Sequence, residues 1–166
     1  MNQSNRPIPY ADNLDDSLSI LNTRHGVFYP TGYVVVCYAT AEQLNTAWQE
    51  SWHDALPGDD VSALRADQMR FVCDRSDEKA TTVGTIVGAE LKQIDILRQI
   101  ADQGGEFLIL SDGVIDADRL QEILRNPPPV KTLRYGLLTI EELVEEDQSA
   151  IVDNPLGQNE RARDID

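Results

Sequence analysis

The sequence is short of cysteine, of lysine and of long apolar runs, and each shortage excludes a class of protein. Cys37 and Cys73 stand in apolar segments with no CxxC spacing and no neighbouring histidine, so the sequence predicts neither a zinc site nor a disulfide framework. The longest apolar run, residues 33–39, is far too short to cross a bilayer, and the N-terminal residues lack the apolar core of a secretory signal. We therefore expect reduced, buried thiols, no membrane association and a cytoplasmic location.

Basic side chains are scarce as well. Lysine and arginine number 14 against 29 aspartates and glutamates, which gives a formal net charge of −15. A field of this sign repels phosphate backbones and anionic lipid, so direct binding of nucleic acid is not expected. The charge has two interpretations: a hydrated surface that serves solubility or a saline habitat, or mimicry of the charge of a nucleic acid. Solubility alone accounts for the charge, which favours the first interpretation.

The apolar segments that are present fall into two units of strand, helix and strand. In the first unit, residues 32–39 form a β-branched and aromatic run without polar alternation, which is typical of a strand covered on both faces. Thr40 and Gln43 have the spacing of a capping box and predict a helix that ends at the turn at Pro57. Residues 61–65 then predict a short edge strand.

The second unit repeats this order. Residues 106–111 predict another buried strand, and Asp116 predicts the cap of a short helix. Residues 130–138 alternate apolar with polar side chains, which predicts an edge strand. Thr139 and Glu142 have the capping-box spacing, which predicts a closing turn of helix.

A longer helix is predicted between the two units. Apolar side chains follow a 3.6-residue period from residue 76 to residue 103, and Gly104 and Gly105 stand where a helix would end. The period continues past Gly84 and Gly88, so the sequence predicts one unbroken helix, the longest element of the chain.

Together these elements predict a single α/β (α+β) domain with a ferredoxin-like β-α-β repeat of about four strands and a long helix inserted between the two units. Residues 32–39 and 106–111 would lie side by side at the centre of the sheet. A doubly wound parallel sheet is the alternative. The domain covers residues 32–144, between a polar N-terminal arm (1–31) and an acidic, flexible C-terminal tail (145–166).

The predicted sheet needs a cover on both of its faces. The helices of the two units cover one face. The inserted helix, the N-terminal arm or the sheet of another copy could cover the second face. On these grounds we expect a homodimer, and a different protein partner is also open.

The turns after the two central strands predict a ligand site, because ligands favour the carboxyl ends of parallel strands and the N-termini of helices. The residues that this argument places at the site are Thr40, Ser111, Asp112, Gly113 and Tyr135. The alternative is that these residues serve ordinary capping and turn chemistry, which every junction of strand and helix needs.

The sequence predicts no catalytic residues, no metal site and no cofactor. It contains no Walker, GxGxxG or GxSxG motif. Asp112, Asp116 and Asp118 lack the spacing of a calcium-binding loop. Cys37 lies in an apolar strand without a group that would orient a histidine toward it, so a core cysteine is favoured over a nucleophile.

Several short motifs resemble a known family. Residues 32–36 (Gly-Tyr-Val-Val-Val), 41–42 (Ala-Glu) and 59–61 (Asp-Asp-Val) are similar to the bacterial heat-induced general-stress domain of the YflT type. Residues 105–108, 135–136 and 139–143 are similar to uncharacterised bacterial relatives of that domain, so the resemblance spans about residues 32–144. The resemblance implies a small stress-associated accessory protein without known catalytic residues.

The sequence therefore favours a non-enzymatic, stress-associated binding or regulatory module that acts through protein contacts or a small ligand. Two alternatives stay open. One is an enzyme on a ferredoxin-like dimer, with a pocket near the turns between strand and helix. The other is an acidic mimic that occupies a nucleic-acid-binding protein.

Overall fold

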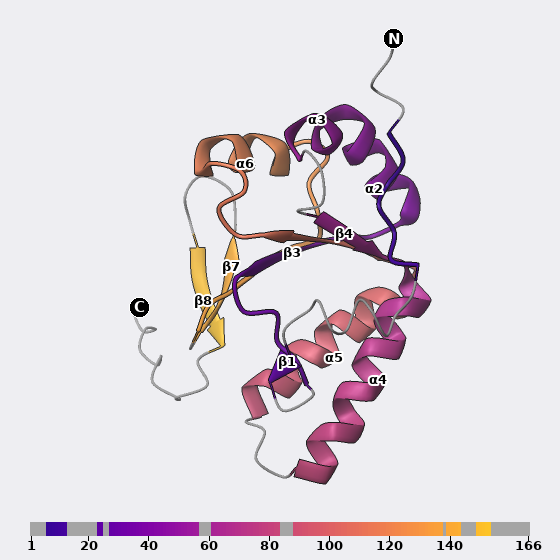
Figure 1. Cartoon of the computed structure of the whole chain (residues 1–166), viewed down its shortest axis with the longest axis vertical. Coiled ribbons are helices and arrows are strands. Elements are labelled where there is room, and N and C mark those ends of the chain that lie inside the picture. Colours follow the sequence, from indigo (N-terminus) through magenta and orange to yellow (C-terminus); the bar gives the residue numbers. More distant parts are fainter. Residues whose placement is uncertain are drawn as a thin grey trace, which may run out of the picture.

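A six-stranded sheet runs through the middle of the molecule, with helices on both of its faces (Figure 1). The computed structural model describes residues 6–12, 23–24, 27–56, 61–83, 88–137, 139–143 and 149–153. The strands follow the spatial order β4 (Val61–Leu64), β5 (Glu106–Ser111), β3 (Tyr33–Tyr38), β6 (Lys131–Tyr135), β7 (Ile140–Leu143) and β8 (Ser149–Asp153). A separate two-stranded sheet joins β1 (Thr23–Arg24) to β2 (Val27–Phe28).

Strands β3 and β5 lie side by side in the interior of the large sheet, as the sequence predicts. They pair antiparallel from Tyr33 opposite Ser111 to Tyr38 opposite Glu106. Their alternate side chains enter two separate apolar cores, with Val35 on one face of the sheet and Val36 on the other. Uninterrupted apolar runs are therefore required, because neither face of these strands meets water.

One face of the sheet is covered by the helices of the two units (Figure 1). The first is a continuous helix of three parts: α2 (Ala41–Ala47), the π-helical η2 (Trp48–Trp52) and α3 (His53–Ala55). The second is α6 (Ala117–Leu124). Both predicted N-caps are confirmed: the Thr40 side chain accepts from the Gln43 N–H at 3.0 Å, and Asp116 accepts from the Arg119 N–H at 2.9 Å.

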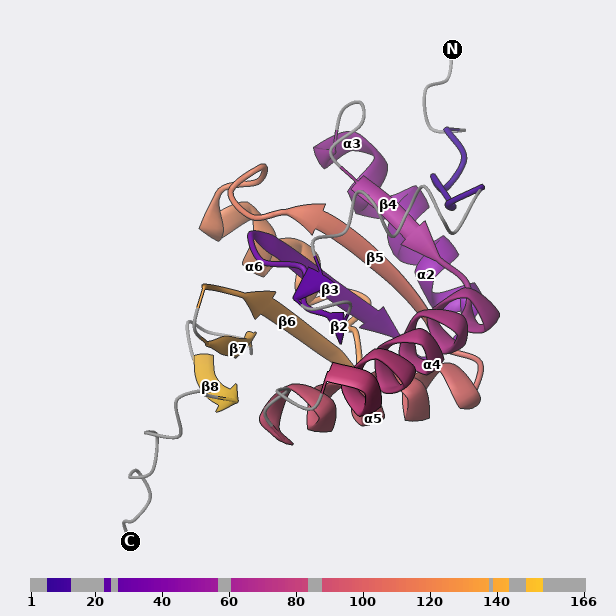
Figure 2. The ribbon, with the colours of Figure 1, turned by 60° about the horizontal axis from the view of Figure 1, so that its bottom comes forward.

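The other face is covered by a pair of helices, α4 (Ala66–Val83) and α5 (Gly88–Asp102), which pack side by side (Figure 2). The prediction of one unbroken helix from 76 to 103 is wrong, because α4 begins ten residues earlier and ends at Val83, and a second helix, α5, begins at Gly88 and packs against it. A single helix over 66–102 would be roughly 55 Å long and would extend beyond the sheet that it packs against. The predicted end is confirmed by Gly104, with φ of +92°.

The topology interleaves two β-α-β units. Strands β3 and β4 are both antiparallel to β5, so they run parallel to each other with β5 between them. Likewise β5 and β6 run parallel on either side of β3. The general α/β (α+β) class is therefore confirmed, whereas the predicted count of about four strands is too low, because β7 and β8 extend the sheet beyond β6.

Strand β7 replaces a predicted helix. The Thr139-to-Glu142 spacing suggested a capping box, yet Ile140 belongs to the core on one face of the sheet and Leu143 to the core on the other. A strand places residues three apart on opposite faces, whereas a helix would place them on the same side. Strand β6 is consequently an interior strand, and its predicted edge position is wrong.

The segments outside the predicted domain also take part in the fold. Val27, Phe28 and Tyr29 are buried in the core beneath β3, and β8 lies in the segment predicted as an acidic tail. In the arm, Tyr10 forms a parallel bridge with Ala63 at the free side of β4. None of the helices in the described ranges is both long and apolar enough to span a membrane.

The sequence predicts a homodimer because a second copy could cover the face of the sheet opposite α2 and α6. Helices α4 and α5 of the same chain bury that face, with Met69 and Leu97 fully inside the core. A second copy is therefore not needed to cover the sheet. The second face of the sheet therefore gives no ground for a homodimer, which stays a prediction.

Candidate functional site

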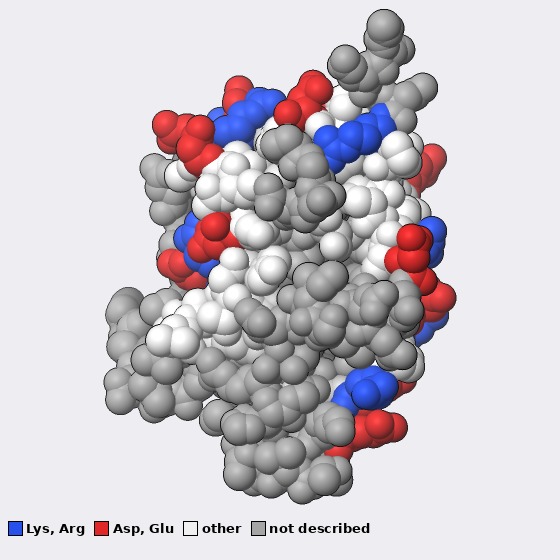
Figure 3. Space-filling model, viewed as in Figure 1, with Lys and Arg blue, Asp and Glu red and all other residues white. Residues whose placement is uncertain are grey.

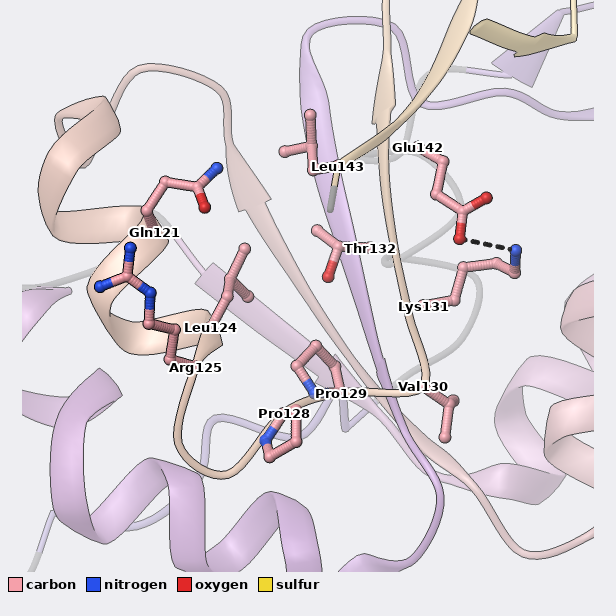
Figure 4. A pocket seen from close by; sticks show the side chains of 10 residues that line it. All are labelled: Gln121, Leu124, Arg125, Pro128, Pro129, Val130, Lys131, Thr132, Glu142 and Leu143. Carbon is pink, nitrogen blue, oxygen red and sulfur yellow. Dashed lines mark ion pairs between the residues drawn. The ribbon is translucent and has the colours of Figure 1, made fainter. Parts of the chain in front are cut away.

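A pocket of about 220 Å³ opens between α6 and the sheet, beside the segment that leads from the helix into β6 (Figure 4). Prolines shape this segment, because they donate no backbone hydrogen bond and cannot continue a helix. The Val130 N–H donates to the Cys37 carbonyl at 2.8 Å and ties the end of the segment to β3. The pocket is lined by Gln121, Leu124, Arg125, Pro128, Pro129, Val130, Lys131, Thr132, Glu142 and Leu143.

Apolar side chains form about half of the pocket lining. Leu124 projects from α6 toward the sheet, and Leu143 comes from β7 on the opposite side (Figure 4). Pro128 and Pro129 close the end nearest the loop, and Val130 is 52% exposed beside them. Small-molecule sites combine apolar side chains with polar groups that fix the orientation of the ligand.

Two uncharged polar side chains enter the pocket from opposite sides. Thr132 is only 2% exposed, and its side chain points from β6 toward α6 (Figure 4). Gln121 faces the pocket from α6. Neither the Thr132 hydroxyl nor the Gln121 amide has a hydrogen-bond partner within the described ranges, so both are available to a ligand.

The charge at the pocket comes from Arg125. Lys131 and Glu142 also line it, but their side chains form an ion pair of 3.0 Å on the far side of the strands from α6 (Figure 4). Strand alternation explains this, because Glu142 shares its face with Ile140, which packs in the core under α4 and α5. Arg125 follows the last turn of α6, and its guanidinium has no carboxylate partner among the described residues.

Arg125 differs from the other arginines whose side chains the structure describes. Each of those has a partner: a carboxylate, a backbone carbonyl or an aromatic ring. Arg98, Arg119 and Arg134 bind carboxylates, Arg6 and Arg70 donate to carbonyls, and Arg65 and Arg75 lie over rings. No such partner holds Arg125 in the described part of the chain.

The structure separates the residues of the predicted site. Thr40 follows β3 and Ser111 ends β5, and because these strands are antiparallel the two turns lie at opposite ends of the sheet. The reasoning from adjoining turns fails for that reason. It assumed the geometry of neighbouring parallel strands, whereas neighbours from two interleaved units run antiparallel.

The other predicted residues lie near one another at the Ser111 end of the sheet. Asp112 pairs with Arg134 at 3.3 Å, and Gly113 makes the turn with φ of +90°. Tyr135 is buried on the face of α4 and α5, where its ring meets Tyr29 edge-on at 5.3 Å. None of these residues lines the pocket.

Sequence reasoning missed the pocket, although part of its signal is visible. Three prolines, 127–129, stand between the end of an amphipathic helix and a strand, so the chain must cross an extended gap there. The missing part is the pairing of β6 with β7. Without it, nothing in the sequence brings Leu143 opposite Leu124.

The thiols and the buried histidine are held in structural positions. Burial raises the pKa of Cys37, and burial raises the pKa of Cys73 to about 12, so both thiols stay protonated near neutral pH. The Nδ1 atom of His53 lies 3.0 Å from the Trp48 carbonyl oxygen. Within the described ranges, no three metal-ligating side chains come together.

No family model, no curated protein and no solved structure matches the chain. The resemblance to the YflT-type domain therefore stays a prediction.

Proposed function

We propose that this protein is a non-enzymatic binding module that holds a small ligand in the pocket between α6 and β6. The observation that carries this proposal is a set of three polar side chains beside apolar ones: the side chains of Thr132, Gln121 and Arg125 have no partner within the described ranges, and all three line the same pocket. Unpartnered polar groups that line one pocket together with apolar side chains are a common feature of ligand sites.

The scaffold around the pocket supports this role. Thr132 lies on a strand with a paired neighbour on each side, and its side chain is almost entirely buried. On the other wall, α6 is fixed by the Asp116 cap and by Leu120 and Ile123 in the core. Side chains held on such elements need little ordering when a ligand binds, which lowers the cost of binding.

The chemistry of the described residues favours binding over the enzymatic alternative. Catalysis by a nucleophile requires a nucleophile within hydrogen-bond reach of a base. Cys37 and Cys73 are buried with raised pKa values, and His53 packs on the opposite face of the sheet from Cys37. The pocket itself contains a hydroxyl, an amide and a guanidinium, which bind and orient a ligand.

The surface charge gives less support to the acidic mimic. A mimic of a nucleic acid would present its carboxylates in an unbroken row. On the face in Figure 3, described acidic side chains stand beside basic ones at the margins, with uncharged side chains between. Arg98, for example, contacts Asp74 and Asp95 at 3.3 and 3.1 Å.

A more specific fold class, the ferredoxin-like arrangement, is part of the proposal. We infer a ferredoxin-like core of β3, β4, β5 and β6, supported by the strand order β4-β5-β3-β6 and by both unit helices on one face. Helices α4 and α5 would then be an insertion, and β7 and β8 an extension. The cytoplasmic, stress-associated role rests on composition and on the family resemblance.

A fragment screen by saturation-transfer NMR tests the proposed function. We expect several small molecules to bind the wild-type chain and to lose binding in Leu124→Trp, because the larger ring fills the cavity. Leu124→Met conserves the volume and is the matched control, which should keep binding. Thermal unfolding of both variants checks that they fold. Retained binding in a folded Leu124→Trp variant would contradict the proposal.

A further inference from the structure

We infer that the ligand of this pocket is a small monocarboxylic acid with a compact apolar body. The inference rests on the proposed binding function and adds the chemical class of the ligand. It follows from the balance of donors and acceptors at the pocket, from its volume, and from the unpaired state of Arg125 in a strongly acidic protein.

Donors outnumber acceptors around the cavity. The Arg125 guanidinium has five N–H donors and no acceptor, and the Gln121 amide and the Thr132 hydroxyl can each also donate. The one lining carboxylate, Glu142, binds Lys131 on the other side of the strands. A ligand that complements these groups must supply acceptors, and a guanidinium binds a carboxylate through two parallel hydrogen bonds.

The volume limits the rest of the ligand. Cavities of roughly 150 Å³ admit benzene, whereas drug-sized ligands occupy roughly 300–1,000 Å³. The cavity of about 220 Å³ therefore accommodates a body of the size of one ring, plus a carboxylate. Leu124, Leu143 and the prolines would contact this body, while its charged end meets Arg125 at the rim.

The state of Arg125 is unusual for this protein. With a formal net charge of −15, carboxylates are plentiful, and three of the other described arginines, Arg98, Arg119 and Arg134, are bound to them. Arg134, for example, contacts two carboxylates, those of Asp112 and Glu141. Arg125 follows Glu122 on the same helix, yet Glu122 is taken by Arg119 at 3.2 Å. Arg125 is thereby left available for an anion from solution.

The position of the pocket separates a carboxylate from a phosphate. Phosphate dianions favour several cations or the N-terminus of a helix. Here the C-terminal end of α6 faces the pocket, so its dipole opposes negative charge, and Arg125 supplies a single positive charge. One positive charge balances one carboxylate and leaves a dianion undercompensated.

Calorimetric titration of the full chain with three ring compounds of matched shape tests the inference. Benzoate carries a negative charge, benzamide is neutral and benzylamine is positive. We expect benzoate to bind at least about tenfold more tightly than benzamide, from its charged hydrogen bonds to Arg125, and benzylamine to bind most weakly.

Two variants that each remove one positive charge complete the test. Arg125→Gln should lower benzoate affinity about tenfold or more and leave benzamide affinity unchanged. Arg75→Gln on α4 removes the same charge outside the pocket, where Arg75 lies over the Phe71 ring, and should change neither affinity. Equal affinity for benzoate and benzamide would overturn the carboxylate assignment, and so would equal losses of benzoate affinity in the two variants. The binding module would still be supported if Leu124→Trp abolishes binding in the fragment screen. Binding of none of the three compounds would overturn the assignment as well, and the fragment screen decides separately whether the module binds any ligand.

Discussion

At the scale of single residues, two buried aromatic side chains share the main polar contact of the core under α2 and η2. The Trp52 Nε1–H donates to the Tyr38 hydroxyl at 2.9 Å, and both rings are fully buried. A buried N–H without an acceptor retains the full cost of its desolvation. This contact therefore fixes how the first helix lies on β3.

Tyr38→Phe removes the acceptor of this bond. We expect the free energy of unfolding to fall by about 1–3 kcal/mol, because the Trp52 N–H loses its partner at a fully buried position. Urea unfolding followed by tryptophan fluorescence measures the change. Tyr33→Phe on the same strand is the control, because Tyr33 is only half-buried, and it should cost clearly less. Equal losses in both variants would contradict this role of the bond.

The same tyrosine predicts a response to alkaline pH. Burial raises the pKa of Tyr38 to about 12 from its ordinary 10.0, and burial raises the pKa of Cys73 to about 12 from 9.0. The folded chain therefore holds protons that the unfolded chain releases, so this stability is fully present below about pH 9 and is lost as pH rises toward 12.

Urea midpoints measured from pH 7 to pH 11 test that direction. We expect little change from these two groups up to about pH 9 and a steady fall above it. Tyr38→Phe should flatten the part of the fall that begins near pH 10. If the urea midpoint of the wild-type chain increases as the pH is raised above 9, the predicted direction of the pH dependence is wrong.

Residue-level features were predictable where their cause is local. The caps at Thr40 and Asp116 follow from side chains within three residues of the N–H groups that they accept from, and both are confirmed. The capping-box spacing at Thr139 had the same form and failed. There, cross-strand ion pairs from Arg134 and Lys131 hold Glu141 and Glu142 in a strand.

At the scale of elements, the N-terminal arm is held to the first helix at its C-terminal end. The Arg6 guanidinium donates to the carbonyls of His53 and Leu56 at 3.0 and 2.7 Å. In return, the Trp48 Nε1–H donates to the Arg6 carbonyl at 2.8 Å. These bonds satisfy carbonyls that the end of the helix would otherwise leave open.

Arg6→Ala should release the arm from its position beside β4. The Ala63 N–H donates to the Pro9 carbonyl at 2.9 Å, so its hydrogen exchange reports whether the arm is in place. We expect exchange at Ala63 to become at least about tenfold faster, because local opening then costs less free energy. In Arg6→Lys, the Ala63 amide should be only partly protected from exchange, because a single ammonium cannot donate to two carbonyls in the geometry of a guanidinium.

The amide of Val36, deep in the central strand, is the internal reference for this experiment. Its exchange should change little in Arg6→Ala, because β3 pairs with strands on both sides. Uniform acceleration at Ala63 and Val36 would instead mean that the whole fold is destabilised and that the arm has no local role.

Among the elements, β3 and β5 were predictable because both faces of each strand are buried, so the apolar run itself carries the signal. The pair α4 and α5 was not. The apolar period runs on from α4 into α5, so it does not separate the two helices. The local sign of the break is the pair Gly84 and Gly88, which lower helix propensity, but glycines are also tolerated inside helices and do not decide between one helix and two.

At the scale of the whole molecule, the two faces of the sheet have different roles. Helices α4 and α5 cover one face, whereas α6 and the first helix cover the other (Figure 1). The pocket lies on the second of these faces, between α6 and β6. Strand order explains why the predicted site was misplaced. Turns that look equivalent in the sequence leave from opposite ends of an antiparallel pair.

The central claim is that the pocket between α6 and β6 is the place where this protein binds its ligand. A titration of the isotope-labelled full chain with benzoate, followed through the backbone amide signals, tests it most directly. The account predicts that the signals which shift belong to Gln121, Leu124, Arg125, Thr132 and Leu143 and their neighbours. Shifts confined to Thr40 or to Ser111, Asp112 and Gly113, or spread without a centre, would contradict it.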